Sequence, residues 1–260
     1  MTEKSMERPD RFRALAAESG LPSEAVEEWI RGVLPAAYLS EGGDGPLVAR
    51  MGGDPLLPTD APTPSDPFVA DVDLAALPPG ATNLPLPADG RLLFFASPDV
   101  SGAQGVQPDT VLYVPAGTPT VVRPLDDAWR KPYQPRELRT FWQAPAVREP
   151  ESFALETWGE EADEEEFELA EQLDDAWGAA GENRPVWVLQ LGGHPVYPQN
   201  DPVHHARYSD ESVDDWTLLA TWRCGDDVTE LDSGIAHWVI RRRDLDERRF
   251  DRVHRYVEMA

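Results

Sequence analysis

Two heptapeptides with the same pattern, Gly-Gly-x-Pro-x-x-Pro, lie in the two halves of the chain, at residues 52–58 and 192–198. Each follows a short apolar run and precedes a second apolar run and then a third that begins with glycine. A Gly-Gly-x-Pro sequence favours a tight turn, because glycine adopts backbone angles that other residues avoid and proline fixes its own φ. The shared order and similar spacing predict a duplicated β unit, with copies over residues 46–97 and 186–243.

Short apolar runs separated by Gly, Pro, Asn and Asp fill most of the chain after residue 45, which is typical of strands and turns. We expect strands over residues 47–51, 68–72, 91–96, 110–114, 120–123, 139–143, 186–191, 217–223, 235–241 and 252–258. No apolar run approaches the length of about 20 residues that a membrane-spanning helix needs. The pattern therefore predicts a β-rich domain over residues 46–260 and no contact with a membrane.

The first part of the chain, residues 1–45, reads as a helical hairpin that packs on this domain. Asp10 is a candidate N-cap for the first helix, and Gly20 ends it. The second helix follows Pro22, with Val26 and Trp29 on one face.

A strongly acidic segment over residues 149–180 separates the two proposed copies. Its apolar residues Phe167, Ala170, Leu173 and Trp177 recur at spacings of three and four, which predicts an amphipathic helix over about residues 163–179. The segment is therefore an acidic helical insertion. Its outer face offers candidate partner-binding carboxylates, namely Glu164, Glu165, Glu168 and Glu171. The alternative is a solvated face that only maintains solubility.

Charge limits the classes of partner. The chain has 23 Lys and Arg against 48 Asp and Glu, a formal net charge of −25. Such a field repels phosphate, so nucleic acid is not an expected partner, whereas a basic protein is. We expect the arginines clustered after residue 240 to pair with carboxylates of the chain itself. A charged N-terminus and the single cysteine, Cys224, favour the cytoplasm.

Asp54 and His194 occupy the same position in the two heptapeptides, directly after the glycines. If the two loops converge, these residues are candidate catalytic groups, as an acid/base or ligand-holding pair. The alternative is that both are ordinary polar residues of a turn.

Two weaker constellations involve histidine. His194, His204 and His205 with Asp201 and Asp210 could attract a divalent metal, but their spacing lacks a known ligand pattern, so a polar loop is the default and no metal or cofactor is expected.

Cys224 with His237 could form a nucleophilic pair, although a free cysteine is more often an inert apolar residue. No other nucleophile or phosphate-loop motif occurs, which favours a role other than an enzyme.

Ordered segments in both halves resemble one known family. In the first half they are Gly52-Gly53-x-Pro55-x-Leu57-Pro58, then Phe68-x-Ala70-x-Val72-Asp73-Leu74, then Gly90-x-Leu92-x-Phe94-Phe95; in the second half they are Leu191-Gly192-Gly193-x-Pro195, Gly234-x-x-x-Trp238-Val239-Ile240 and Asp244-Leu245. Over about residues 45–260 the chain is similar to the YwqG-like family, domain of unknown function 1963. The resemblance implies a mainly β, roll-like bacterial fold and no established activity.

The chain departs from that family where similar proteins carry glutamines in the strands after each heptapeptide. Here Asp71 and Thr221 occupy those positions. If the glutamines bind a ligand, the candidate ligand-binding residues are Asp71, Gln199 and Thr221. If they only satisfy buried backbone groups, shorter polar residues and a water can replace them.

Together these observations predict an α+β, β-dominated fold in which roll-like antiparallel sheets arise from a duplicated strand unit with an N-terminal helical hairpin. The expected function is a non-enzymatic protein-interaction module with an acidic surface, for example in the manner of a toxin-neutralising immunity protein. The alternative is a small-molecule-binding protein or hydrolase that uses a cleft between the two Gly-Gly-x-Pro loops. The sequence leaves the oligomeric state open, with a monomer favoured.

Overall fold

The structure is a computed structural model that describes residues 3–97, 105–125, 132–141, 144–181, 186–209, 215–225 and 234–259. Its helices are α1 (Glu3–Glu18), α2 (Ser23–Arg31), α3 (Pro150–Trp158), α4 (Glu164–Ala180), α5 (Pro202–Ser209) and α6 (Arg242–Asp246), with 3-10 turns η1 (Leu74–Ala76) and η2 (Phe250–Arg252). Its strands are β1 (Leu34–Ser40), β2 (Leu47–Met51), β3 (Leu56–Pro58), β4 (Phe68–Asp73), β5 (Arg91–Phe95), β6 (Gly105–Val106), β7 (Val111–Val114), β8 (Thr120–Val122), β9 (Arg136–Thr140), β10 (Ala144–Ala146), β11 (Leu189–Gly192), β12 (Trp216–Arg223), β13 (Gly234–Arg241) and β14 (His254–Met259).

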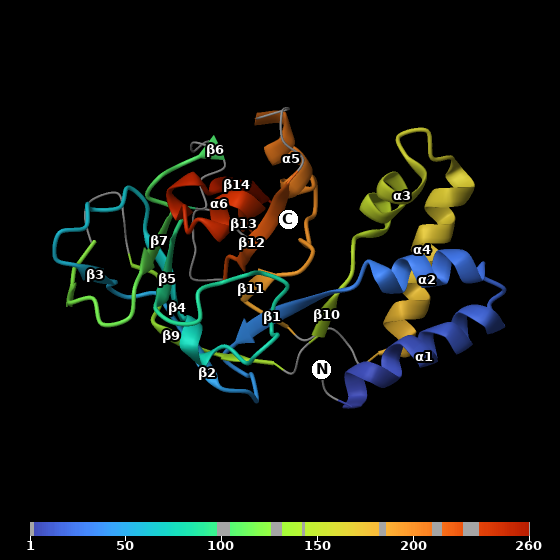
Figure 1. The fold of residues 1–260 in the computed structure, drawn as a ribbon, viewed down its shortest axis with the longest axis horizontal. Helices are drawn as coiled ribbons and strands as arrows, with labels where there is room; N and C mark the ends of the chain where they lie inside the picture. Colours follow the sequence, from blue (N-terminus) through green and yellow to red (C-terminus); the bar gives the residue numbers. More distant parts are fainter. Residues whose placement is uncertain are drawn as a thin grey trace.

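One large, curled antiparallel sheet dominates the molecule (Figure 1). Within the described residues its strand order is β6-β14-β13-β12-β11-β1-β9-β2-β4-β5-β7, with β10 paired to β1 beside this path, while β3 and β8 form a separate ribbon. The curl brings Phe94 of β5 and Trp238 of β13 together, with ring centroids 5.0 Å apart in the main core. The expected β-dominated α+β fold is confirmed.

The two halves of the sheet have matching local features. β2 pairs with β4 and β4 with β5, while β11 pairs with β12 and β12 with β13. The register shifts between Phe68 and Ala70 in one half and between Leu218 and Ala220 in the other. These features agree with the proposed repeat, and the superposition of the two copies under one rotation stays a prediction.

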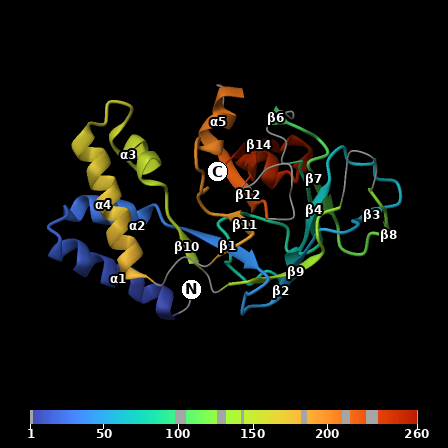
Figure 2. The same cartoon turned by 180° about the vertical axis from the view of Figure 1, so that it is seen from behind.

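Helices α1 to α4 form a separate helical lobe with its own core (Figure 2). Trp177 of α4 meets Phe12 of α1 edge to face, with ring centroids 5.3 Å apart. Trp29 of α2 packs on Phe153 of α3 at 4.8 Å. The N-terminal hairpin therefore packs mainly on the helices of the acidic segment, because these four helices bury their apolar faces on one another.

Helix α4 agrees closely with the sequence prediction. A capping box begins it: the amide of Glu166 donates to Asp163 Oδ1 at 3.0 Å, and the amide of Asp163 donates to Glu166 Oε2 at 2.9 Å. Ala170, Leu173 and Trp177 are buried, and Phe167 is half-buried against the same core.

Several elements differ from the sequence interpretation. The expected start of the first helix after Asp10 is wrong, because α1 begins at Glu3 and continues through Pro9. A proline removes one hydrogen bond inside a helix, but contacts with α4 hold this turn in place: Arg8 donates to the Trp177 carbonyl at 2.8 Å and lies over its ring.

Residues 1–45 also contain β1, which pairs with β11, β9 and β10. The polar stretch around His204 forms helix α5, and the start of the arginine-rich segment forms α6. The strand expected over residues 139–143 begins earlier, at Arg136, and residues 142–143 lie outside the described part.

The glycines of the two Gly-Gly turns have similar, positive φ angles. The φ angles are +67° and +68° at Gly52 and Gly53, and +64° and +72° at Gly192 and Gly193. The second turn also lies close to strands β1 and β10. A Cβ on Gly193 would lie 2.6 Å from Ala146 Cβ and 2.7 Å from Ala36 Cβ. Glycine is needed here for both conformation and space.

We predict that Gly193→Ala destabilises the protein more than Gly117→Ala does. Both glycines have positive φ, but a Cβ on Gly117 meets nothing within 4 Å. The control should lose about 1 kcal/mol from the left-handed backbone alone, and Gly193→Ala about 1–3 kcal/mol more from overpacking. Urea unfolding measures both, and equal losses would contradict the close approach.

Candidate functional site

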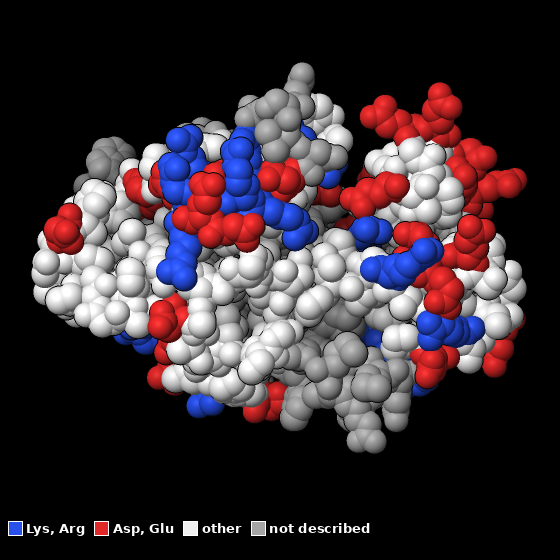
Figure 3. All heavy atoms as spheres, in the orientation of Figure 1, with Lys and Arg blue, Asp and Glu red and all other residues white. Residues whose placement is uncertain are grey.

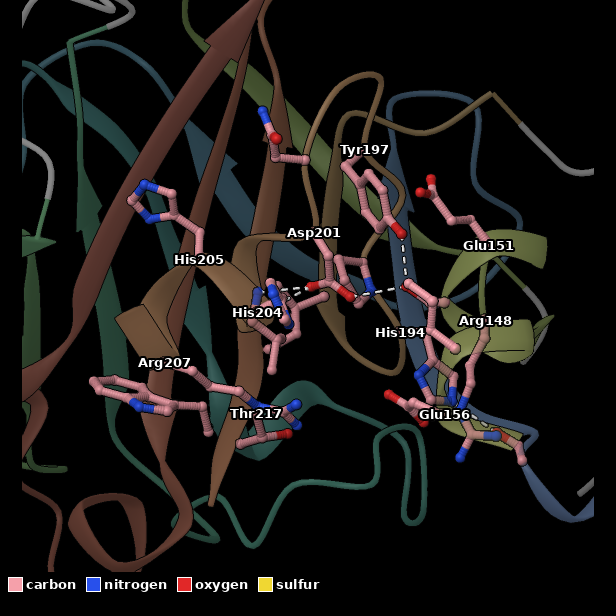
Figure 4. Close-up of a pocket in the computed structure, with 18 of the residues that line it drawn as sticks. Arg148, Glu151, Glu156, His194, Tyr197, Asp201, His204, His205, Arg207 and Thr217 are labelled. Carbon is pink, nitrogen blue, oxygen red and sulfur yellow. Dashed lines mark hydrogen bonds and ion pairs between the residues drawn. The ribbon is translucent and has the colours of Figure 1, made fainter. Parts of the chain in front are cut away.

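A cleft of about 800 Å³ lies between the helical lobe and the sheet. One wall comes from the end of α2, α3 and the chain that leads into α3. The other comes from the second Gly-Gly loop, α5, the start of β12 and the start of α6. Figure 4 shows Glu151 and Glu156 on the α3 side, with Arg207 and Thr217 across from them.

His194 joins the second Gly-Gly loop to the helical lobe. Its Nε2 lies 2.7 Å from the carbonyl oxygen of Gly32, the residue that ends α2. Since a carbonyl only accepts hydrogen bonds, Nε2 carries the proton and donates it. Burial lowers the pKa of His194 to about 4, with a further lowering from nearby Arg148, and these outweigh the opposing effects of the Gly32 bond and Asp201. The imidazole is therefore neutral and acts as a tether.

A second polar contact crosses the cleft beside this tether (Figure 4). Ser152 of α3 shares a hydrogen bond of 2.6 Å with the Tyr197 hydroxyl and donates one of 3.0 Å to Asp201 Oδ2. The other oxygen of Asp201 accepts from the amides of Val203 and His204, at 2.8 and 3.2 Å, and so caps α5. Burial raises the pKa of Tyr197, so its hydroxyl stays protonated.

Of the predicted pair, only His194 lines the cleft. Asp54 is an exposed residue of the first Gly-Gly loop, where the amide of Gly53 bonds to the Tyr133 carbonyl at 2.9 Å. The structure therefore does not bring Asp54 and His194 together. Gln199 does line the cleft, and its amide donates to the Met259 carbonyl at 2.8 Å.

Asp71 lies on β4, fully buried between two arginines. Arg91 Nε donates to Asp71 Oδ1 at 2.6 Å, and Arg50 Nη2 donates to Oδ2 at 3.1 Å. Burial raises the pKa of Asp71, and the two guanidinium groups oppose that rise. Its carboxylate serves internal contacts and does not line the cleft.

Thr221 occupies the matching place in the other half of the sheet. Its hydroxyl lies 2.9 Å from His237 Nδ1, and His237 Nε2 lies 3.4 Å from Glu258 Oε1. This Thr-His-Glu series was missed from the sequence, because the three residues come from separate strands. Thr221 and His237 have no exposed surface, so a substrate cannot reach the threonine hydroxyl in this structure.

The histidines of the proposed metal stretch point to different partners. His194 binds Gly32, His204 Nε2 lies 2.9 Å from the Tyr208 hydroxyl, and the ring of His205 packs on Tyr256 at 4.3 Å. Asp210 lies outside the described residues. In the described part of the chain, no three His, Cys, Asp or Glu side chains are grouped so as to hold a metal ion.

Cys224 and His237 lie in different surroundings. Cys224 is partly exposed and packs against the main core, whereas His237 is fully buried with Thr221 and Glu258. The proposed nucleophilic pair therefore has no geometric support in the described residues.

Several of the arginines near the C-terminus pair internally, as expected. Arg249 binds Asp251 at 3.0 Å, Arg252 approaches the same carboxylate, and Arg255 pairs with Asp66. Figure 3 shows blue and red side chains mixed over the region of α6.

The predicted acidic face of α4 is exposed. Glu164, Glu165, Glu168 and Glu171 all face solvent. None of them forms an ion pair in the part of the chain that the structure describes. Figure 3 shows acidic side chains crowded over the upper part of the helical lobe.

The fold and the cleft define a β-dominated α+β protein in which a helical lobe stands against a curled sheet. The chain belongs to the family described as a domain of unknown function (DUF1963), which matches residues 49–258. The match includes both Gly-Gly turns, α3 to α6 and most of the sheet, while α1, α2 and β1 precede it. A comparison with curated proteins gave no match. No described helix has the length and apolar character needed to cross a bilayer.

We predict that the free energy of unfolding falls less on acidification in His194→Gln than in wild type. Native His194 has a pKa of about 4 against an ordinary 6.5, so between these values the unfolded chain binds a proton that the native protein does not. Its contribution is therefore complete above pH 6.5 and falls as the pH drops towards 4. Glutamine does not titrate, so this part of the loss disappears.

The measurement is urea unfolding at neutral pH and near pH 5, compared between wild type and variant. His254, whose pKa burial also lowers to about 4, contributes equally in both proteins. His204→Gln controls for removal of a histidine from the same cleft. An unchanged pH dependence in His194→Gln would contradict the buried, neutral tether.

Proposed function

We propose that this protein is a non-enzymatic interaction module whose acidic helical lobe binds a basic protein partner. The observation that carries the proposal is the row of exposed carboxylates on α4, which lack counter-charges of their own in the described structure. The contrast with the C-terminal arginines supports it, because several of those cations are balanced internally. A toxin-neutralising immunity protein is one example of such a module.

Rigid presentation of these charges favours binding further. Leu173 and Trp177 anchor α4 in the lobe core, and the capping box fixes its first turn. A fixed row of like charges attracts an oppositely charged surface at long range. Because the helix backbone is already ordered, only the carboxylate side chains lose conformational freedom on binding. The cytoplasm is the proposed location of this interaction.

A second candidate function, small-molecule binding, is favoured by the cleft between the lobes. Its volume of about 800 Å³ lies within the usual range for ligand sites, and polar side chains enter it from both walls. The cleft differs from the one expected from the sequence, since only the second Gly-Gly loop contributes to it.

The interaction proposal predicts that glutamine at Glu164, Glu165, Glu168 and Glu171 weakens partner binding about tenfold or more, and that raising the salt concentration weakens wild-type binding towards the same level. A charge-matched control replaces exposed carboxylates of the sheet lobe by their amides, namely Asp60, Asp89, Glu137 and Asp246. Partners captured from the host cell by wild type are purified. Calorimetry then measures the affinity of each partner for wild type, for the α4 variant and for the control variant.

The control variant distinguishes a specific surface from net charge. Binding that survives in the control and fails in the α4 variant supports the proposal. Equal affinity of the two variants would overturn it, because they carry the same net charge.

The cleft function predicts that a fragment library yields compounds that raise the melting temperature of wild type and lose this effect in Tyr208→Ala. Tyr208 lines the cleft and is 71% exposed, so its truncation removes a contact surface with little cost to the fold. Val186→Ala, at another highly exposed apolar residue outside the cleft, is the matched control. Fragments that ignore the Tyr208 change would argue against a site in this cleft.

A further inference from the structure

The charges that line the cleft differ between its two walls. On the α3 wall, Glu151 and Glu160 are exposed and form no ion pair with any described residue. The two arginines on this side are already balanced, because Arg148 pairs with Glu156 at 2.9 Å and Arg31 pairs with Glu28. This wall therefore presents uncompensated negative charge.

The opposite wall presents positive charge. Arg242, the first residue of α6, is exposed, and its guanidinium forms no ion pair within the described residues. Arg207 of α5 lines the same wall and has contacts of its own. Both oxygens of the one carboxylate there, Asp201, are engaged by Ser152 and by the α5 amides.

Apolar surface lies between these charges. Leu155 of α3 is 39% exposed and Tyr208 of α5 is 71% exposed, and the two side chains line opposite walls. Large apolar side chains exposed on both sides of one cleft provide contact for an apolar body.

We propose that the cleft binds a small zwitterion, with a cationic amine towards Glu151 and Glu160, an anionic carboxylate or phosphate towards Arg242, and an aliphatic or aromatic body between Leu155 and Tyr208. This inference rests on the second candidate function and adds the chemical class of its ligand. A ligand with one charge leaves one wall uncompensated, whereas a zwitterion matches both. A zwitterion that contacts both walls also adds to the link that Ser152 of α3 forms with Tyr197 and Asp201 across the cleft.

Linear ω-amino acids of increasing length test the proposal, because each carries an amine and a carboxylate at a known separation. The alkylamine and the alkanoate of the same carbon number are the single-charge controls. Calorimetry should show one favoured length, at which the zwitterion binds about two- to fivefold more tightly than either control, since one exposed ion pair adds only a small factor. An ω-aminoalkyl phosphate of that length compares the two anionic ends.

Single substitutions separate the two ends of the ligand. Glu151→Gln should weaken the zwitterion and the alkylamine and leave the alkanoate unchanged. Arg242→Gln should weaken the zwitterion and the alkanoate and leave the alkylamine unchanged. The matched controls are Glu161→Gln and Arg243→Gln, exposed neighbours that do not line the cleft and should change none of the affinities.

The outcomes distinguish this inference from the function on which it rests. Zwitterions that bind no more tightly than the single-charge controls overturn the inference. If fragments still bind in a manner that depends on Tyr208, small-molecule binding stands with a different ligand class. If neither zwitterions nor fragments bind, both fail.

Discussion

Strand β1 determines how the parts of this molecule are arranged. Along one edge it pairs with β11, and along the other with β9 and β10, so it connects the two halves of the sheet. It directly follows α2, while β10 precedes α3, so the pair β1–β10 is the neck that carries the helical lobe. The close approach of Gly193 to Ala36 and Ala146 fixes the second Gly-Gly loop against this same neck. The cleft exists because loop and lobe are both held there.

The two halves of the sheet share a backbone plan but bury different polar groups. Asp71 and Thr221 each follow an alanine at the same point of the pairing, and each lies on the face opposite the main core. A buried carboxylate requires cations, which Arg50 and Arg91 supply, whereas a threonine is satisfied by neutral His237. Buried polar groups must find partners, so each residue at this position needs matching neighbours. Of the two Gly-Gly loops, the second lines the cleft and the first does not.

Local patterns in the sequence were enough to predict elements whose cause is local. The spacing from Phe167 to Trp177 predicts α4, and the Gly-Gly pairs predict the turns. The start of α1 was mispredicted, because Arg8 gains its contacts from a residue on α4, far away in the sequence. For the same reason, only part of the candidate site could be predicted from the sequence. His194 and Gln199 belong to it, but its walls meet through pairs such as Ser152 with Tyr197, which no spacing rule connects.

The two proposed binding modes use charge over different ranges. The carboxylates of α4 share one sign, so their field extends into solvent over about 8 Å at physiological salt and attracts a basic partner before contact. In the cleft, Glu151 and Arg242 have opposite signs and their fields largely cancel outside it, so each is felt only by a ligand between the walls. The helical lobe carries both α4 and one wall of the cleft. If either ligand shifts that lobe on the β1–β10 neck, the affinities at the two sites become linked, and reciprocity requires each ligand to change the binding of the other by the same factor.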